Sequence, residues 1–199
     1  MTDYRTATSI GERIQAARKD RGMRTAADLA AAIPDGVVKE STIQNVEAGR
    51  KAELTVSQLL NLALALRVPP IYLLAPVGTP DATLDLANLS SDFKSMTVVE
   101  FDAWLSGTTS GAYRATSTDE HQDRNHLQAI RELNAAVTER TRLERVRQLE
   151  REVASSANSK NADDSPSLQD AQLTETNRRI NDLRSYLKSA GLAVDEWIL

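Results

Sequence analysis

The sequence predicts an all-α protein in which a small N-terminal domain of five helices is followed by a helical C-terminal region. Apolar residues recur at helical spacing through most of the chain. Several of these stretches open with a Ser or Thr that is followed three residues later by an acidic residue or Gln, the capping box that begins a helix. Only 4 % of the 199 residues are aromatic, so we expect a compact domain with helical appendages rather than one large core.

The predicted N-terminal domain, residues 1–76, consists of short helices with local start and stop signals. The pairs expected to open helices are Ser9 with Glu12, Thr25 with Asp28, Thr55 with Gln58 and, beyond this domain, Thr97 with Glu100. Gly22 should end the first helix, Pro34-Asp35-Gly36 the second and Pro69-Pro70 the fourth. A short fifth helix over 71–74 should close the core.

The stretch 41–50 is predicted to form a third helix with two different faces. Ile43 and Val46 lie three residues apart and should point into the core. Ser41 with Gln44 forms a further predicted capping box, and Gly49 suits the helix end. The outward positions carry Lys39, Glu40, Ser41, Gln44 and Asn45. A short helix with charged, hydroxyl and amide groups on its outer face, held on a scaffold, is suited to the DNA major groove.

The distribution of charge favours the N-terminal part of the chain for contacts with phosphate. The chain as a whole has a net charge of −4. Residues 1–75 carry ten Lys and Arg against eight Asp and Glu, a net charge of +2, which leaves −6 for the remainder. Because a surplus of two charges is a weak electrostatic footprint, the prediction of DNA binding depends on the face of the third helix.

Several other classes of function are not expected. The chain has no cysteine, which excludes thiolate metal sites and cysteine nucleophiles and fits a reducing cytoplasm. The longest apolar-rich run, residues 59–66, is too short to span a membrane. His121 and His126 stand five apart in a polar stretch, and no phosphate-binding glycine loop or nucleophile elbow occurs. We expect a cytoplasmic protein that is not an enzyme, with no metal, cofactor or membrane contact.

Residues 10–74 resemble the Cro/CI-type (XRE) family of helix-turn-helix transcriptional regulators, whose domain has the five-helix fold of lambda repressor. The resemblance depends on the order and spacing of short motifs: Gly22, Thr25, Leu29-Ala30, Ser41-Thr42-Ile43, Glu47-x-Gly49-Arg50 and Leu59-Leu60-x-Leu62-Ala63-x-Ala65-Leu66-x-Val68. Each motif alone is weak, but together they are specific. The resemblance covers about a third of the chain and implies a DNA-binding transcriptional repressor.

The resemblance also implies roles for residues on and around the third helix. Base-reading positions match Lys39, Glu40, Ser41, Gln44 and Asn45, phosphate-contacting positions match Arg50, Lys51 and Thr25, and a structural pair matches Arg18 and Glu47. Ala26 and Ala48 stand where the family often has Gln and Asn, which should weaken anchoring to the DNA backbone. The turn 33–38 is longer than is usual in the family, which leaves the tilt of the third helix open. For Gln44 and Asn45, an ordinary solvated surface is the alternative.

Glu40 leads to a specific hypothesis about the DNA sequence. A carboxylate repels phosphate, but it accepts a hydrogen bond from the amino group of cytosine. We therefore expect Glu40 to select cytosine at one operator position.

Residues 77–110 are predicted to form a linker and a small helical segment in which Trp104 is a packing anchor. This segment either packs back on the first domain or forms a satellite of its own. Residues 111–199 should form a helical region with a flexible polar stretch to 123, a long helix over 125–153, a flexible tether over 154–167 and a final helix over 168–190. The apolar stripe of the long helix shifts around its axis after 138, so this helix either breaks there or presents two faces.

We expect residues 125–199 to mediate dimerisation, because one short reading helix covers too few base pairs for useful specificity. The apolar end 197–199 should be buried within the chain or against a second subunit. Two functions from different classes follow. The first is a sequence-specific repressor that binds operators as a dimer, such as a phage or prophage immunity repressor that maintains lysogeny. The second is an antitoxin-like protein whose C-terminal helices bind a protein partner while its DNA-binding fold autoregulates the operon.

Overall fold

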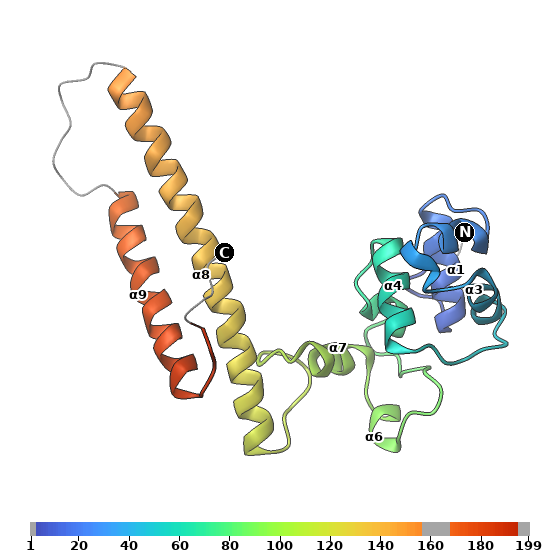
Figure 1. The fold of residues 1–199 in the computed structure, drawn as a ribbon. Coiled ribbons are helices and arrows are strands. Elements are labelled where there is room, and N and C mark those ends of the chain that lie inside the picture. The colour runs from blue at the N-terminus through green and yellow to red at the C-terminus, as the bar shows by residue number, and fades with distance from the viewer. Residues whose placement is uncertain (1–2, 157–167, 195–199) are drawn as a thin grey trace. The chain divides into compact units, whose positions relative to one another are not determined.

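The computed structural model describes residues 3–156 and 168–194, without the side chains of 154–156. Within these ranges the protein is all-α and contains no β-strand, as the sequence predicts (Figure 1). The chain divides into two compact units, Met1–Ser106 with Ser110–Arg114 and Gly107–Thr109 with Ala115–Leu199. Most of the predicted tether (157–167) and the predicted burial of residues 197–199 lie outside the described residues, and the first three residues of that tether, 154–156, are helical instead.

The first unit contains seven of the described α-helices and a short 3-10 turn. These elements are α1 (Ile10–Asp20), α2 (Ala26–Ala31), the 3-10 turn η1 (Pro34–Gly36), α3 (Glu40–Glu47), α4 (Val56–Leu66), α5 (Ile71–Leu74), α6 (Ser91–Lys94) and α7 (Val98–Ser106). The five helices predicted within residues 10–74 are therefore present as elements. The second unit contains α8 (Thr118–Ser156) and α9 (Leu168–Ser189).

Local caps open most helices of the first unit where the sequence predicts them. The Thr25 hydroxyl accepts from the Asp28 N–H while the Asp28 carboxylate accepts from the Thr25 N–H. The same reciprocal box joins Thr55 to Gln58 at the start of α4. At α1 the Ser9 hydroxyl accepts from the Glu12 N–H, but the Glu12 carboxylate bonds to Thr8 instead of Ser9. These bonds satisfy backbone donors that the first helical turn leaves free.

The predicted capping box at Ser41 is wrong. The N-cap of α3 is Lys39, whose side chain makes no capping hydrogen bond, and the helix begins at Glu40. Tertiary packing sets this start, because Val38 is only 1 % exposed and fixes the chain directly before the helix. Gln44 then donates from Nε2 to Glu40 Oε1 at 2.7 Å, one helical turn away, instead of capping the helix.

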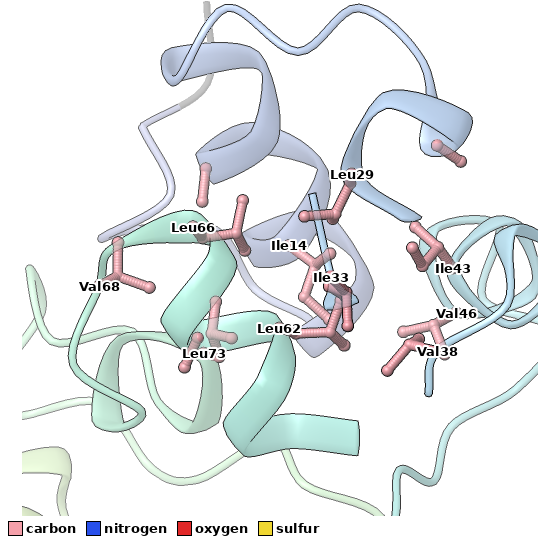
Figure 2. Close-up of a cluster of buried hydrophobic side chains, with 13 residues drawn as sticks. Ile14, Leu29, Ile33, Val38, Ile43, Val46, Leu62, Leu66, Val68 and Leu73 are labelled. Atoms are coloured by element: carbon pink, nitrogen blue, oxygen red, sulfur yellow. The ribbon is translucent and has the colours of Figure 1, made fainter. Parts of the chain in front are cut away.

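A single apolar core holds α1 to α5 together (Figure 2). Its fully buried members come from each of these helices and from the turn between α2 and α3: Ile14, Leu29, Ile33, Val38, Ile43, Val46, Leu62, Leu66 and Leu73. The short α3 contributes only Ile43 and Val46. Because a helix of about two turns is unstable alone, these two contacts fix α3 to the rest of the unit.

The segment 77–106 packs back on the first unit. Leu84, Val98 and Phe101 form a second buried cluster with Ala75, and Ile71 and Leu74 of α5 pack against it. This arrangement decides between the two alternatives left by the sequence. Trp104 acts as the predicted packing residue, because its ring stacks on Phe101 at 6.0 Å and meets Phe93 edge-on at 5.0 Å between ring centroids.

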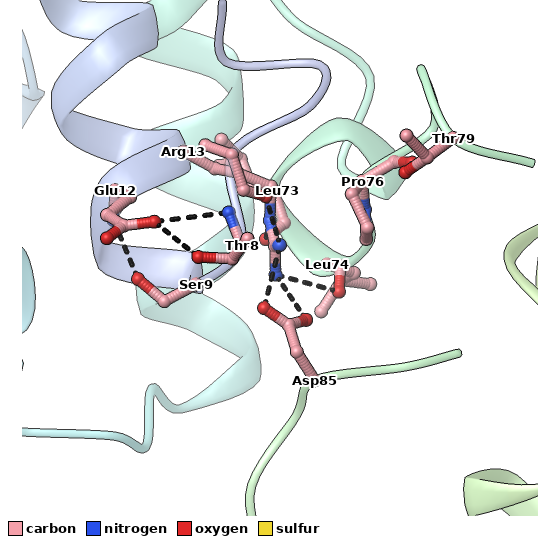
Figure 3. A network of polar contacts seen from close by, with 10 residues as sticks. Thr8, Ser9, Glu12, Arg13, Leu73, Leu74, Pro76, Thr79 and Asp85 are labelled. Atoms are coloured by element: carbon pink, nitrogen blue, oxygen red, sulfur yellow. Dashed lines mark hydrogen bonds and ion pairs between the residues drawn. The ribbon is translucent and has the colours of Figure 1, made fainter. Parts of the chain in front are cut away.

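A buried arginine joins this segment to α1 (Figure 3). Arg13 is 0 % exposed, and its guanidinium donates to both oxygens of Asp85 at 2.9 Å. It also donates to the backbone carbonyl oxygens of Leu73, Leu74 and Ala7. A buried guanidinium is tolerated only when its donors are satisfied. Asp85 supplies the carboxylate that balances the charge of Arg13. The sequence analysis did not identify this pair.

The second unit is an antiparallel pair of helices (Figure 1). Leu133 and Val137 of α8 pack with Ile180 and Leu187 of α9 in its core. Arg179 of α9 donates to Glu132 of α8 at 2.9 Å on the outer surface. One chain therefore buries the main apolar stripe of its own C-terminal helices.

Two predictions for the long helix are corrected. Residues 118–123, predicted as part of a flexible stretch, form the first turns of α8, where the Ser117 hydroxyl accepts from the Glu120 N–H. The helix also continues unbroken past Thr138. Thr138 and Thr141 donate from their hydroxyls to backbone carbonyl oxygens one turn earlier, so the polar joint is accommodated within the helix. The alternative of a break near Thr138 is therefore excluded, and Leu149 and Val153 of the second stripe are exposed.

No helix of the described ranges combines the length and apolar character needed to cross a membrane.

Candidate nucleic-acid interface

The two faces of α3 differ as the sequence predicts. Ile43 and Val46 are each 1 % exposed and belong to the core. The predicted base-reading residues Lys39, Glu40, Ser41 and Gln44 are exposed, and Asn45 is half-buried. The structure therefore places these five side chains together at the N-cap and along the first two turns of one short helix. None of them is needed to fill the core.

Two helices and one glycine determine how closely α3 is held. The helix packs against α1 and α2. Gly11 of α1 lies so close to α3 that a Cβ atom there would stand 2.1 Å from the Val46 carbonyl oxygen. Only glycine allows this approach without a shift of one of the helices. Gly11 therefore sets the distance between α1 and α3, a role that the sequence analysis missed.

Arg18 and Glu47 form the predicted structural pair. Arg18 Nε and Nη2 each donate to a carboxylate oxygen of Glu47 at 2.7 Å, and Nη1 donates to the Met23 carbonyl oxygen at 2.8 Å. The two side chains are only 5 % and 7 % exposed. The hydrogen bonds to Glu47 raise the pKa of the Arg18 guanidinium above its ordinary value. The pair joins the C-terminal turn of α1 to the end of α3.

Hydrogen bonds orient two of the candidate reading side chains. Gln44 donates its amide N–H to the Glu40 carboxylate, which leaves the amide oxygen of Gln44 directed away from Glu40. Asn45 Oδ1 accepts from Arg50 Nε at 3.0 Å. The oxygen of this amide is therefore used within the protein, and its N–H groups are the part that can donate to a ligand. The surface formed by α3 and the turn after it thus presents oxygen acceptors at Glu40 and Gln44 and N–H donors at Asn45 and Arg50. Hydrogen bonding to base edges requires acceptors and donors of this kind.

The end of α3 places the predicted phosphate contacts Arg50 and Lys51. The backbone N–H groups of both residues donate to the Asn45 carbonyl oxygen, at 2.9 and 3.0 Å. Gly49 makes this turn with a φ of 68°, a left-handed conformation that favours glycine. Arg50 is exposed and Lys51 is half-buried. The two cationic side chains therefore begin immediately beyond α3.

Thr25, the third predicted phosphate contact, lies at the N-cap of α2. Its hydroxyl accepts from the Asp28 N–H, so its first role is to begin the helix that packs against α3. The long turn between α2 and α3 folds as η1, with Asp35 and Gly36 both at a φ of 60°. The additional residues of this turn therefore lie in η1, which is exposed outside the core.

Comparison of the chain with family models, with curated proteins and with solved structures found no match.

Proposed function

We propose that the chain is a sequence-specific DNA-binding repressor that acts as a dimer on operator sites, with residues 10–74 folded as a helix-turn-helix domain of the lambda-repressor type. One observation carries the proposal: Lys39 at the N-cap and Glu40, Ser41 and Gln44 on α3 are exposed, while Ile43 and Val46 are fully buried. A short helix anchored by apolar contacts and presenting polar side chains outward has the form required to enter the major groove.

The packing around α3 supports this proposal. The helix is held by α1 and α2 through the core and through the Arg18–Glu47 pair. Rigid support matters because reading base edges requires side chains held at defined positions. Arg50 and Lys51, which follow the helix, supply the positive charges that phosphate contacts need.

A dimer on a two-fold operator follows from the small size of the reading surface. One helix of eight residues reads only a few base pairs, so useful specificity needs paired half-sites. Blocking transcription from such sites in a bacterial cytoplasm is the activity of a phage or prophage immunity repressor, which is the cellular role we propose. No cofactor, metal or enzymatic step enters this mechanism.

Selection of bound sequences from random DNA tests the proposal. The purified chain is mixed with a random duplex library at a low and a high salt concentration, and the recovered sequences are read. We expect a defined motif with two-fold symmetry at both concentrations, with weaker total binding at high salt because phosphate contacts release counterions. Recovery of unselected sequences at both concentrations contradicts sequence-specific binding.

A second candidate function is suggested by the surface of the C-terminal unit. Leu149, Val153 and Leu168 are 55 %, 68 % and 77 % exposed. Gln169 donates to Glu150 at 2.7 Å, which joins the beginning of α9 to α8. Exposed apolar side chains on one unit are typical of protein-binding surfaces when they lie together. An antitoxin-like protein would use this surface for its partner and the first unit for autoregulation.

The gene neighbourhood and a titration distinguish the two candidates. A small toxin-like reading frame beside the gene favours the second, and an integrase gene with operator-like repeats favours the first. If a toxin-like neighbour exists, its purified product should bind the chain, and Leu168→Lys should weaken that binding. Unchanged binding by Leu168→Lys removes this surface from the second candidate.

A further inference from the structure

Three apolar side chains form a row on the outer face of α4. Val56, Leu60 and Leu64 are 74 %, 49 % and 78 % exposed, whereas Leu62 and Leu66 of the same helix are buried in the core. Their spacing of four residues places the three side chains on one side of the helix. Exposed apolar area of this kind is unfavourable in water and marks a contact surface when it is contiguous. We call these three residues the α4 row.

The charges at the ends of α4 indicate what kind of partner fits the row. No charged residue occurs from Val56 to Leu66, so the row does not offer the cations that a phosphate backbone needs. Glu53 precedes the helix, and Arg67 directly follows it; both are exposed. Glu53 lies in the non-helical stretch before the N-cap Thr55, where its carboxylate accepts from the Asn88 side chain, and Arg67 is the C-cap residue of α4. The surface is therefore apolar about its centre and opposite in charge at its two ends.

We propose that the α4 row is the interface through which two copies of this chain associate, with the two α4 helices antiparallel about a two-fold axis at Leu60. Val56 of one copy then meets Leu64 of the other, and Leu60 meets its own equivalent. Glu53 of each copy lies opposite Arg67 of the other. A two-fold interface uses the same patch on both subunits, so it requires this self-complementary pattern. Rows of residues four apart are also ridges by which helices interdigitate.

A cavity lies at one end of the row and has both apolar and cationic residues in its lining. It has a volume of about 550 Å³ beside Leu64, and its lining includes Met23, Pro34, Arg21 and Arg67. In the antiparallel arrangement the beginning of the partner's α4, preceded by a glutamate, enters this end. The cavity supplies apolar walls for the partner's first helical turn and the Arg67 guanidinium for its carboxylate, whereas the Arg21 guanidinium already donates to the Leu66 carbonyl oxygen and pairs with Asp20.

The inference rests on the dimer of the proposed function and locates its interface, but association can be measured without DNA, so its failure is distinguishable from a failure of DNA recognition. It assigns dimerisation to the first unit, whereas the sequence analysis expected it from residues 125–199. A second copy is the partner that the two-fold pattern favours. A different protein on the α4 row is one outcome of the test below.

Sedimentation of the full chain without DNA tests the proposal. We expect the wild-type chain to form dimers as its concentration rises, and Leu60→Lys and Leu60→Glu each to remain monomeric. Like charges at position 60 would face each other across the axis, whereas an equal mixture of the two variants pairs opposite charges and restores the dimer. Leu105→Lys is the matched control, because Leu105 is 46 % exposed on α7 of the same unit. This control should associate like the wild type.

Each contrary result has a definite meaning. A wild-type chain that is monomeric at every concentration overturns the proposal and leaves the α4 row to a different protein. A dimer that persists in both Leu60 variants overturns it in favour of another interface. If both variants are monomeric but their mixture forms no dimer, the two-fold axis at Leu60 is wrong. Binding of Leu60→Lys to a single selected DNA half-site is measured separately, so loss of DNA recognition is not mistaken for loss of pairing.

Discussion

The contact between Arg18 and Glu47 shows how one side-chain pair positions α3, which carries the proposed reading surface. Both side chains are nearly buried. The Glu47 carboxylate accepts from two nitrogen atoms of the Arg18 guanidinium, and the Met23 carbonyl oxygen accepts from the third. The pair itself adds little to stability compared with apolar replacements, but either group alone would be a buried and unpaired charge. Its consequence for function is that the end of α3 is held against α1.

Replacement of Arg18 by Met should destabilise the first unit strongly. Removal of the guanidinium leaves the Glu47 carboxylate buried without its partner, and we expect a loss of about 3 kcal/mol in the free energy of unfolding. Urea denaturation followed by circular dichroism measures it. Arg5→Met is the matched control, because Arg5 pairs with Asp3 at an exposed site and its loss should change little. Equal effects of the two replacements would contradict the account of the buried pair.

Glu40→Ala should change the base preference of the protein at one operator position. The carboxylate is exposed at the start of α3 and is held by the Gln44 amide, so it is available to accept from the amino group of cytosine. Selection from random DNA should show cytosine enriched with the wild type and not with the variant. Asp81→Ala removes an exposed carboxylate elsewhere in the unit and should leave the motif intact. The same preference at every position in Glu40→Ala contradicts the hypothesis.

At the scale of the helices, the local signals that begin and end a helix were predicted best from the sequence. Capping boxes at Thr25 and Thr55 and the stop at Gly22 involve residues within four positions of one another, so their spacing alone specifies them. The start of α3 was not predicted because burial of Val38 decides it. Arg13 and Asp85 were missed because the two residues are far apart in sequence, and no local pattern marks a pair that only the folded chain brings together.

The close approach of α1 and α3 leads to a prediction with a definite sign. Helix propensity alone would make Gly11→Ala stabilising by about 1 kcal/mol. The clash with the Val46 carbonyl oxygen should instead destabilise the first unit and move α3 away from α1. Thermal unfolding and affinity for a selected DNA site should therefore both fall. Lys19→Ala, an exposed change on the same helix, should leave both unchanged, and a gain in stability for Gly11→Ala would contradict the predicted clash.

The capping box of α2 should make stability depend on acidity. Hydrogen bonds from the Thr25 N–H and hydroxyl lower the pKa of the Asp28 carboxyl below its ordinary value. A lowered pKa in the folded state stabilises the protein above the ordinary value of about 3.9 and loses that contribution as the pH falls through the folded value. Asp28→Asn keeps an oxygen acceptor but does not titrate, so unfolding measured across this range should show a weaker dependence on pH. An unchanged pH dependence contradicts this role of the carboxylate.

At the scale of the whole molecule, the chain consists of two units with different surfaces. The first has an apolar core that supports the polar face of α3 and leaves the α4 row exposed. The second buries its main stripe between α8 and α9 and leaves Leu149, Val153 and Leu168 exposed. The sequence predicted the helical class and most helices of both units. It could not predict whether α8 would break, because the shift of its stripe is compatible with a kink or with two faces until the packing of α9 is known.

The outward residues of the candidate site were predicted from the sequence more completely than the contacts that hold and orient them. The apolar positions Ile43 and Val46 separate the two faces of α3 by helical geometry alone, so the outward residues follow from spacing. The Arg18–Glu47 pair was expected from the family resemblance and not from spacing. The orientation of the Gln44 and Asn45 amides, by contrast, depends on bonds to Glu40 and Arg50 that only the folded helix defines.

The most direct test of the central claim compares a double variant with the wild type on selected DNA and on random DNA. Replacement of Gln44 and Asn45 together by Ala removes two of the proposed reading groups but keeps Arg50 and Lys51, the proposed phosphate contacts. The account predicts that this variant loses its preference for the selected site while it keeps salt-sensitive binding to random DNA. Arg50→Ala is the matched control and should weaken binding to all sequences alike, with a salt dependence smaller by about one charge. If the double variant keeps the wild-type preference, α3 is not the element that reads the sequence, and the proposed function is contradicted.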